Sequence, residues 1–351
     1  MSGAAAHFGS CAFHERRPRV EMTLQPAEKE FKAGFVAVLG LPNVGKSTLV
    51  NRLVGEKVAI VSRKPQTTRN RIQGILNRSD AQIVFIDTPG IHEPDSALGR
   101  LMMEEVKQAL EGVDASVLLV DATRATLTPR LAGRPERFQE RGANHFAAGK
   151  WREIVMALPD PVILALNKID LMAKPHLLPL IDAVSKERSF AEIIPISALT
   201  GDGCGLLLRA IVGLLPKGRP YFPPDQFTDQ PERFLAAEII REKAIRATRE
   251  EVPYSIAVLV DQFEEGERLV RISATIQVER ASHKGILIGR GGSMLKRIGT
   301  EARTELERIL GVRLFLSLLV KVEPGWRDDP SKVQRLDWRK QLEEQAESQK
   351  E

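Results

Sequence analysis

Residues 40–48 read Gly-Leu-Pro-Asn-Val-Gly-Lys-Ser-Thr. This stretch contains the pattern Gly-x-x-x-x-Gly-Lys-[Ser/Thr], which forms a phosphate-binding loop where a strand precedes it and a helix follows it. The apolar run Phe35 to Leu39 predicts that strand, and the segment Lys46 to Val54 predicts that helix. A chance match in a chain of this length is on the order of 1%, because glycine makes up only about 7% of residues. We therefore predict a nucleotide site in this loop.

The residue types of this loop indicate how it would hold a nucleotide. Backbone N–H groups and the helix N-terminus would face the phosphates, and the Lys46 ammonium would neutralise the β and γ phosphates. The Ser47 hydroxyl is of the kind that ligates Mg²⁺ in such loops. Nucleotide contacts are expected from Gly40, Asn43, Val44, Gly45, Lys46, Ser47 and Thr48.

Four further apolar segments predict buried strands, and each of them precedes a helical segment. They are Gln82 to Ile86, Ala115 to Val120, Pro161 to Leu166 and Ile193 to Ile196. Strands that alternate with helices are typical of a parallel, doubly wound sheet with both faces covered. The first half of the chain is therefore predicted to be an α/β domain. A stretch rich in Arg, Pro and Gly, Arg124 to Lys150, is expected to be a loop insertion in that domain.

Three motifs follow the ends of predicted strands and complete the nucleotide site. In Asp87-Thr-Pro-Gly90 the carboxylate would hold Mg²⁺ through water, and the Gly90 N–H would meet the γ-phosphate. In Asn167-Lys-Ile-Asp170 the carboxylate of Asp170 can accept hydrogen bonds from N1–H and the exocyclic amine of guanine, a pair of donors that adenine lacks. We therefore expect GTP and GDP as ligands. Base contacts are expected from Asn167, Lys168, Asp170, Ser197, Ala198 and Leu199.

Taken in order, these motifs resemble those of translation-factor-class GTPases and, more narrowly, those of the Era family, bacterial GTPases that bind the small ribosomal subunit. The resemblance rests on Gly40-x-Pro-Asn-Val-Gly-Lys-Ser-Thr-Leu, Ser62-Arg-Lys-x-Gln-Thr-Thr-Arg69, Ser197-Ala-Leu-Thr-Gly201 and Glu251-Val-Pro-Tyr-Ser255. It covers roughly Gly34 to Asp329 and leaves out the Arg124 to Lys150 insertion and both termini. Leu41 stands where the family commonly has Arg.

The resemblance implies the roles of several residues around the phosphates. Gln66 to Arg69 would be the first switch loop, with Thr68 as the second hydroxyl ligand of Mg²⁺ and Thr67 as the alternative. Ile91 stands where Ras-like enzymes carry the Gln that orients the attacking water, so slow intrinsic hydrolysis is expected. Family members use K⁺ in place of an arginine finger, held in part by the residue that is Asn43 here. Asn43 as a residue that only stabilises the turn is the alternative. The catalytic set is then Lys46, Asn43, Thr68 and Gly90.

The second half of the chain predicts a small α+β domain. A proline-rich connector, Pro216 to Pro231, separates it from the first domain. The predicted elements are helix Glu232 to Glu250, strands Tyr254 to Asp261 and Arg268 to Glu279, helix Ser293 to Leu310 and strand Arg313 to Val322. Gly289-Arg-Gly-Gly292 before that second helix resembles the GXXG loop of a type II KH domain. RNA contacts are expected from Lys284, Ile286, Ile288, Gly289, Arg290, Gly291, Gly292 and Lys296.

Composition and charge exclude several classes of protein. The 351 residues are 43% apolar and 28% charged, which is typical of a globular chain of about two domains. Cys11 and Cys204 lie far apart, so neither a disulfide framework nor a zinc site is predicted. No apolar run approaches the roughly 20 residues that a membrane helix needs. Positive charge gathers in Arg124 to Arg152, with seven basic against two acidic residues, and in Ala281 to Trp326, with eight against four.

The predicted organisation has five parts. They are a polar, disordered extension over residues 1–33, a GTPase domain over 34–215, a linker over 216–231, a KH domain over 232–326 and a polar tail over 327–351. The extension has no secretory signal, and Met22 is an alternative start. The tail is expected to be a solvated helix or disordered.

The resulting expectation is a GTP-hydrolysing switch whose KH domain binds RNA. By resemblance, the RNA is the 3′ end of small-subunit rRNA, and the role is in small-subunit assembly in the cytoplasm, with Mg²⁺ and K⁺ as cofactors. An RNA-binding assembly factor that scarcely turns GTP over and a tRNA-directed GTPase are the alternatives. A monomer is expected, and peripheral contact with the inner face of the cell membrane is left open.

Overall fold

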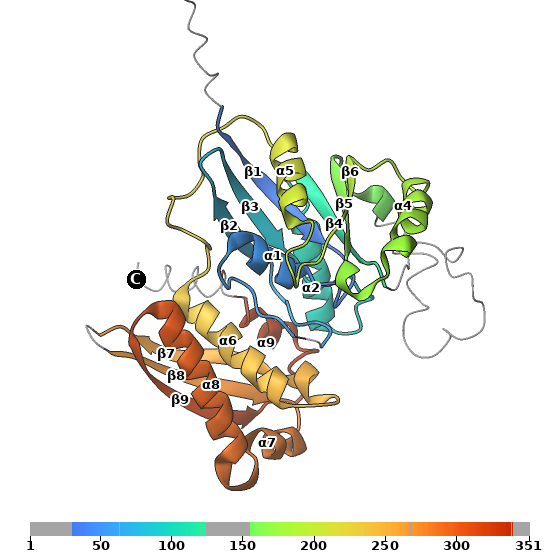
Figure 1. Ribbon diagram of the computed structural model, residues 1–351. Helices are drawn as coiled ribbons and strands as arrows, with labels where there is room; N and C mark the ends of the chain where they lie inside the picture. The colour runs from blue at the N-terminus through green and yellow to red at the C-terminus, as the bar shows by residue number, and fades with distance from the viewer. Residues whose placement is uncertain (1–29, 63, 124–154, 267–268, 338, 340–351) are drawn as a thin grey trace, which may run out of the picture. The chain divides into compact units, whose positions relative to one another are not determined.

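A computed structural model of the chain describes residues 30–62, 64–123, 155–266, 269–337 and 339. The first part of this region contains a six-stranded sheet with the strand order β2-β3-β1-β4-β5-β6 (Figure 1). Its strands are β1 (Lys32–Leu39), β2 (Ile72–Asn77), β3 (Ala81–Asp87), β4 (Ala115–Asp121), β5 (Val162–Asn167) and β6 (Glu192–Pro195). The Arg124 to Lys150 insertion and residues 1–29 of the predicted extension lie outside the described residues. The last residues of the extension are described, and Lys32 and Ala33 belong to β1.

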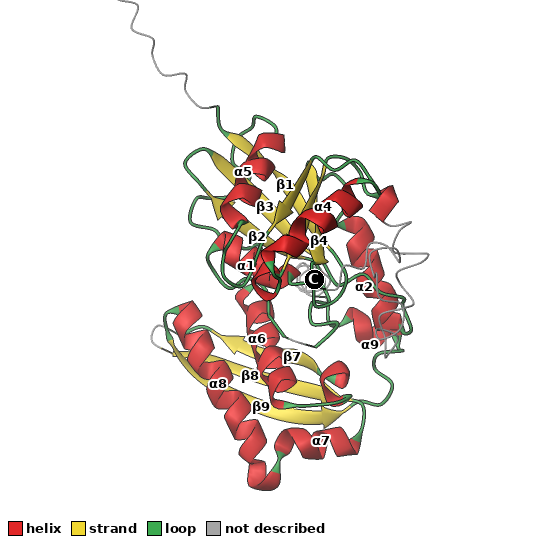
Figure 2. Cartoon of the chain, turned by 45° about the vertical axis from the view of Figure 1, so that its right-hand side comes forward, coloured by secondary structure: helices red, strands yellow, loops and turns green. Residues whose placement is uncertain are grey.

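Helices cover both faces of this sheet (Figure 2). They are α1 (Lys46–Val54), α2 (Ala97–Gln108), α4 (Leu177–Ser185) and α5 (Cys204–Leu214). Because side chains of a strand alternate between faces, Val36 and Val38 of β1 join the core beneath α1 and α5, whereas Ala37 and Leu39 join the core beneath α2 and α4. The predicted doubly wound α/β domain is confirmed in this respect.

One strand of the sheet was not predicted and departs from the parallel pattern. β2 pairs with β3 antiparallel, from Ile72 opposite Asp87 to Asn77 opposite Gln82. The remaining pairs, β1 with β3 and β4, β4 with β5, and β5 with β6, are parallel. A tight turn joins β2 to β3, where Arg78 Nε donates to Asp80 Oδ1 at 2.9 Å. The sheet is therefore mixed, and the short sequence of β2 interrupts its apolar residues with Gln73 and Gly74, which weakened the strand signal.

The proline-rich connector contacts β2, the edge strand of the sheet, and the Gln82 side chain of β3, so it does not stand free of the first domain. Gln82 of β3 is 1% exposed, and its side chain donates to the Phe222 carbonyl and accepts from the Tyr221 and Phe222 N–H groups. The Ile75 N–H donates to the Phe227 carbonyl at 2.9 Å. The bond from Ile75, together with an antiparallel bridge between Gly74 and Thr228, gives part of the edge strand β2 the partners that a further strand would supply.

The second part of the described chain has the order of elements that a type II KH domain requires. They are α6 (Glu232–Ala247), β7 (Ala257–Glu264), β8 (Leu269–Val278), α7 (Ala281–Ile288), α8 (Ser293–Leu310) and β9 (Arg313–Val322). β8 pairs antiparallel with β7 and parallel with β9. One core, which includes Ile239, Ile272 and Leu306, joins the three helices to the sheet.

Several predicted boundaries in this part are wrong: the first helix ends earlier than predicted, the first strand begins later and ends at Glu264 rather than Asp261, and the second strand ends at Val278 rather than Glu279. The first helix ends at Ala247 rather than Glu250, because the backbone of Thr248 is extended, with φ −114° and ψ 165°. A 3₁₀ turn over Val252–Ser255 follows, so β7 begins at Ala257 rather than Tyr254.

The prediction of a solvated or disordered tail is wrong for its first residues. After β9 the chain forms α9 (Pro330–Gln334), whose Val333 is 2% exposed. Val333 and Trp326 share a small core with Leu98 and Met102 of α2. The apolar residues of this segment are too few for periodicity to reveal, yet they are buried. Within the described ranges, none of the helices is long and apolar enough to cross a membrane.

Candidate functional site

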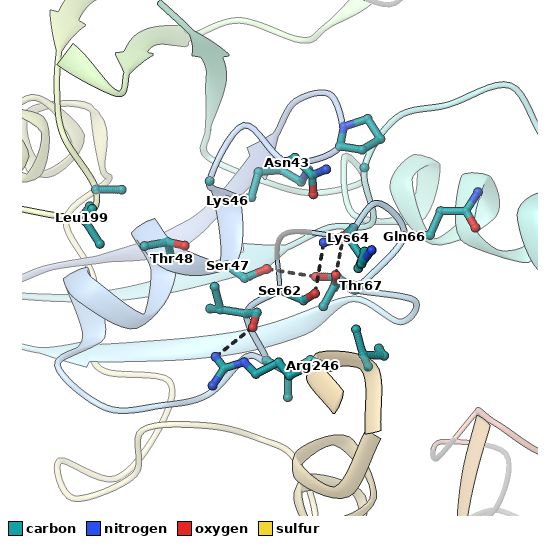
Figure 3. Close-up of a pocket in the computed structure, with 18 of the residues that line it drawn as sticks. Asn43, Lys46, Ser47, Thr48, Ser62, Lys64, Gln66, Thr67, Leu199 and Arg246 are labelled. Atoms are coloured by element: carbon teal, nitrogen blue, oxygen red, sulfur yellow. Dashed lines mark hydrogen bonds between the residues drawn. The ribbon is translucent and has the colours of Figure 1, made fainter. Parts of the chain in front are cut away.

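The predicted nucleotide motifs meet at one edge of the six-stranded sheet. Each follows the carboxyl end of a strand, which in open α/β sheets is where ligands bind. A pocket of about 1370 Å³ lies there (Figure 3). Its lining includes, of the predicted residues, Asn43, Gly45, Lys46, Ser47, Thr48, Thr67, Thr68, Gly90, Asn167, Lys168, Asp170, Ala198 and Leu199. The predicted contacts Gly40, Val44 and Ser197 are buried and do not belong to this lining.

Two glycines of the site, one in the phosphate loop and one in the second motif, are required by close approach. Gly45 has φ 105°, and a Cβ on it would lie 2.4 Å from the Asn167 side-chain nitrogen. Gly90 of the second motif lies against the loop, where a Cβ would come within 2.8 Å of Pro42. A larger residue at either position would push the phosphate loop away from its neighbour.

Ser47, Thr68 and Asp87 bring three oxygen-bearing side chains together at the start of α1. Ser47 Oγ donates to Asp87 Oδ2 at 2.7 Å and lies 2.9 Å from Thr68 Oγ1, which is 3.4 Å from the same carboxylate oxygen. Asp87 is fully buried, and its Oδ1 has no hydrogen-bond partner among the described residues. Hydroxyl and carboxylate oxygens are ligands that Mg²⁺ prefers, so this group fits the metal that the sequence predicted.

The alternative hydroxyl of the switch loop is engaged elsewhere. Thr67 Oγ1 donates to the Lys64 carbonyl at 2.7 Å, on the same loop (Figure 3). Thr68 is therefore the threonine whose hydroxyl lies beside Ser47 and Asp87.

Burial changes the acid–base properties of the two charged groups under the pocket. Desolvation raises the pKa of Asp87 to about 6, although the nearby Lys46 charge and the Ser47 and Thr68 hydroxyls oppose this rise. Desolvation lowers the pKa of Lys46 to about 8, against the attraction of Asp87. The Lys46 ammonium donates to the carbonyls of Gly40 and Leu41, both at 3.1 Å. It is thereby held at the loop where the phosphates of a nucleotide are expected.

On the base side, Asn167 acts as a bridge between two loops. Its Nδ2 donates to the Val44 carbonyl at 2.7 Å, and its Oδ1 accepts from the Ala198 N–H at 2.9 Å. Both functions of the amide are used, so the role that this geometry supports is to position the loops. Lys168 likewise donates to the Asn43 carbonyl at 2.8 Å and to Asp121 at 2.7 Å. Asp121 had no signal in the sequence.

Asp170 and two leucines face the open end of this pocket. Asp170 is exposed in a 3₁₀ turn and lines the pocket, and Leu171 and Leu199 line it as well with exposed fractions of 70% and 69%. A carboxylate and two apolar side chains in one pocket lining suit the edge and faces of a purine ring. Leu171 had no signal in the sequence beyond its place next to the motif.

The position expected to orient the attacking water carries no suitable group. Ile91 is 1% exposed, and its side chain belongs to the core beneath α2 and α4. Asn43, the residue expected near K⁺, is exposed with φ 63°, a conformation that Asn adopts more readily than most residues. The hydrogen bonds of the described residues leave its side-chain amide without a partner.

The predicted RNA loop lies between α7 and α8, and its glycines adopt left-handed conformations. Gly289, Gly291 and Gly292 have φ of 71°, 60° and 78°. A Cβ on Gly289 would lie 2.7 Å from Met294 Cβ, whereas space is open at the other two. Arg290 is exposed within this turn. Of the remaining predicted contacts, Lys296 and Ile286 are exposed and Lys284 is half-buried, while Ile288 packs against the core and offers less apolar surface than predicted.

Comparison with known proteins supports the prediction of a GTPase domain in the first half of the chain and a KH domain in the second. Residues 35–168 match the family model described as "50S ribosome-binding GTPase", and residues 251–327 match "KH domain". "GTPase Era" of Geobacter sp. (strain M21) is 51% identical over 304 residues, which cover 86% of this chain and 96% of that protein. "GTPase Era" of Syntrophus aciditrophicus (strain SB) is 50% identical over 302 residues, covering 86% and 93%.

Solved structures give the same result. The crystal structure of Era in complex with MgGDPNP and nucleotides 1506–1542 of 16S ribosomal RNA is 44% identical, with a TM-score of 0.79, and the match covers 88% of this chain and 99% of that one. A variant of Aquifex aeolicus Era bound to GDP·AlF₄⁻ matches with the same identity, coverage and TM-score. With a phosphate loop, a guanine-type motif and a KH domain in this order, the chain belongs to the Era family of GTPases.

Proposed function

We propose that this GTPase is a Mg²⁺-dependent switch that binds the 3′ end of small-subunit rRNA through its KH domain and acts in assembly of the small ribosomal subunit. The observation that carries the proposal is the match of both domains together, over 88% of this chain, to the Era structure solved with MgGDPNP and a 16S rRNA segment. A match confined to the GTPase domain would give no support for any particular RNA as the partner.

Ser47 and Thr68 would hold Mg²⁺ directly and Asp87 would hold it through water, and the ion would neutralise charge on the phosphates. Lys46 would bind the β and γ phosphates, and Gly90 would offer its N–H to the γ-phosphate. Hydrolysis would be in-line attack of water, without a covalent enzyme intermediate. Because Ile91 cannot orient that water, K⁺ beside Asn43 is the proposed source of the missing charge stabilisation.

In the KH domain, Arg290 and Lys296 would contact phosphates while Ile286 contacts bases. The glycines around Arg290 let a polynucleotide backbone approach closely. Binding experiments with the 3′-terminal segment of small-subunit rRNA, a permuted sequence and a tRNA would test this assignment. Preference for the first RNA supports it, and preference for tRNA would favour the tRNA-directed alternative.

The variant Arg290→Asp with Gly291→Asp isolates the KH loop in that experiment. It keeps Gly289 and Gly292, space is open at position 291, and the φ of 60° there is one that Asp adopts more readily than most residues, so the unfolding temperature should stay near wild type while RNA affinity falls steeply. The slope of affinity against salt should flatten, because each lost phosphate contact releases about 0.7 fewer counterions on single strands. Normal RNA binding by this folded variant would move the site to the basic segment Arg124 to Arg152.

A second candidate, an assembly factor that scarcely hydrolyses GTP, is favoured by the burial of Ile91. Phosphate release measured with and without the rRNA segment, in K⁺ and in Na⁺, separates the two. Turnover that rises with RNA and K⁺ supports the switch, and negligible turnover in every condition supports the second candidate. We further propose a cytoplasmic monomer, which sedimentation would test, and flotation with anionic vesicles would test peripheral membrane contact.

A further inference from the structure

The loop that presents Thr68 has no regular structure of its own to hold it. Residues 61–71, the second part of the connection from α1 to β2, form neither a helix nor a ladder with the sheet where the structure describes them. Thr68 nevertheless is 6% exposed, with its hydroxyl beside Ser47 and Asp87. Two hydrogen bonds lie within the loop, from the Lys64 N–H to Ser62 Oγ and from Thr67 Oγ1 to the Lys64 carbonyl, and groups outside the loop fix both of its ends.

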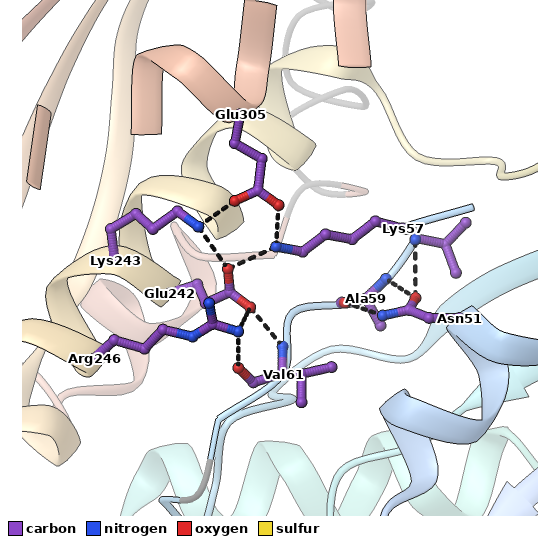
Figure 4. Close-up of polar contacts among 9 residues, drawn as sticks. Asn51, Lys57, Ala59, Val61, Glu242, Lys243, Arg246 and Glu305 are labelled. Carbon is purple, nitrogen blue, oxygen red and sulfur yellow. Dashed lines mark hydrogen bonds and ion pairs between the residues drawn. The ribbon is translucent and has the colours of Figure 1, made fainter. Parts of the chain in front are cut away.

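The start of the loop is fixed by a buried carboxylate of α6 (Figure 4). Glu242 is fully buried, accepts from the Val61 N–H at 2.9 Å and pairs with Lys57 at 2.6 Å. Arg246, one turn further along α6, donates to the Val61 carbonyl at 3.0 Å. Both contacts address the backbone of Val61, so they fix the chain's path.

The end of the loop is fixed by arginines. Arg241 Nη2 of α6 donates to the carbonyl of Thr67, the residue that precedes Thr68. Arg69, which follows Thr68, donates to the Ile256 carbonyl at 2.7 Å and lies over the Trp326 ring at 5.3 Å. Thr68 thus lies between two residues that the KH half of the chain holds.

Among these residues, Arg241 is the one whose side-chain orientation is fixed by two hydrogen bonds to one neighbour on its own helix. The side chain of Arg241 is 3% exposed, and Nε and Nη2 donate to the two oxygens of Glu238 at 2.7 and 2.6 Å. This two-point pairing fixes the plane of the guanidinium before it reaches Thr67, and it balances the buried charge.

We propose that Arg241 is a positioning residue for GTP hydrolysis, which holds the Thr67 carbonyl and so keeps the Thr68 hydroxyl beside Ser47 and Asp87. The inference rests on the proposed role of Thr68 toward Mg²⁺. Since coupling between two sites is reciprocal, a nucleotide that needs Thr68 in this place also favours the contact of α6 with the loop.

Arg241→Met tests the proposal, and Arg233→Met is the matched control. Arg233 lies on the same helix and also donates to backbone carbonyls, those of Val260 and Asp261, but these belong to its own domain. Amide hydrogen exchange of residues 64–70, measured with Mg²⁺ and a nonhydrolysable GTP analogue, should be at least tenfold faster in Arg241→Met and unchanged in Arg233→Met.

Kinetics supply the second measurement. In Arg241→Met, kcat should fall about tenfold and the Mg²⁺ concentration for half-maximal rate should rise, while KM for GTP changes less than twofold. Arg241→Lys should recover part of the rate because it keeps the charge. Wild-type exchange and kcat in folded Arg241→Met would overturn the proposal.

Two further variants keep the outcome interpretable. Arg241→Met leaves Glu238 without its partner, so the single variant can fail to fold. In that case the double variant Glu238→Gln with Arg241→Met is measured instead, and the same results are expected. Thr68→Ala separates the two ideas. If it leaves the rate and the Mg²⁺ requirement unchanged, the proposed role of Thr68 fails; if it impairs both while the Arg241 variants do not, only the positioning role fails.

Discussion

Replacing Asn167 by Asp tests whether a single side chain joins the phosphate loop to the base-binding loop. Asn167 is 2% exposed and spans from the Val44 carbonyl to the Ala198 N–H. Asp has nearly the same shape and can still accept from Ala198. At neutral pH, however, its second oxygen would face the Val44 carbonyl with no proton between them.

The structure allows the size of the effect to be worked out. A buried polar group left without its partner costs about 1–3 kcal/mol, and more where it is charged. We therefore expect the free energy of unfolding of Asn167→Asp to fall by about 3 kcal/mol. At about 2–4 °C per kcal/mol for a domain of this size, the unfolding temperature should fall by roughly 6–12 °C. GDP and GTP should both bind at least tenfold more weakly, because the two loops lose their common support.

The stability of the Asn167→Asp variant should depend on pH, because the introduced carboxyl group is buried. Burial raises the pKa of the introduced carboxyl in the folded state above its unfolded value, so the folded state binds the proton more tightly. Stability should therefore rise as the pH falls from 7.5 toward 5, since the protonated carboxyl can donate to the Val44 carbonyl.

Scanning calorimetry of the nucleotide-free protein and fluorescence titration with a labelled GDP would measure both effects. Asn77→Asp is the control, because Asn77 also donates to a carbonyl, that of Gln226, and accepts from Gln82. It lies on β2 outside the pocket lining, so it should lower stability without changing nucleotide affinity. An unchanged unfolding temperature and unchanged affinity in Asn167→Asp would refute the bridging role.

Three other predictions concern the ligands. Asp170→Asn should weaken GTP binding and shift preference toward xanthine nucleotides, because an amide donor suits a carbonyl at that purine position; competition between GTP and XTP would show it, and unchanged affinities would remove the guanine assignment. Replacing K⁺ by Na⁺ at constant ionic strength should lower phosphate release in the wild type and matter little in Asn43→Ala; equal wild-type rates would exclude K⁺ from the mechanism. Because burial raises the pKa of Asp87 to about 6, apparent Mg²⁺ affinity should rise as the pH increases from 5 to 7 and then level off, and a flat Mg²⁺ titration series would contradict this.

Much of the fold could be predicted because the strands of a buried parallel sheet are continuous apolar runs. β1 and β3 to β6 follow such runs, and α8 and β9 were predicted with their bounds. β2 could not be predicted, because its stability comes from pairing with β3 and from the connector. The packed segment around Val333 was missed for a similar reason, since its partners Leu98 and Met102 lie more than two hundred residues away.

The candidate site likewise contains residues that could be predicted from the sequence and residues that could not. Residues that must touch a phosphate, a metal or a base occur in short motifs whose spacing is fixed by that chemistry, so they could be named from the sequence. Arg241 and Thr67 are separated by 174 positions, and their contact depends on how α6 lies against the loop. Nothing in the local sequence of either residue indicates that contact.

The hydrogen bonds between the connector and the edge of β2 affect how the GTPase domain should be produced alone. A protein cut after residue 215 would lose the bonds to Gln82 and Ile75. Its edge strand would then present free N–H and C=O groups, which promote edge-to-edge association between copies. A protein that continues through Pro231 keeps that edge covered, so it should remain in solution at concentrations where the shorter one precipitates.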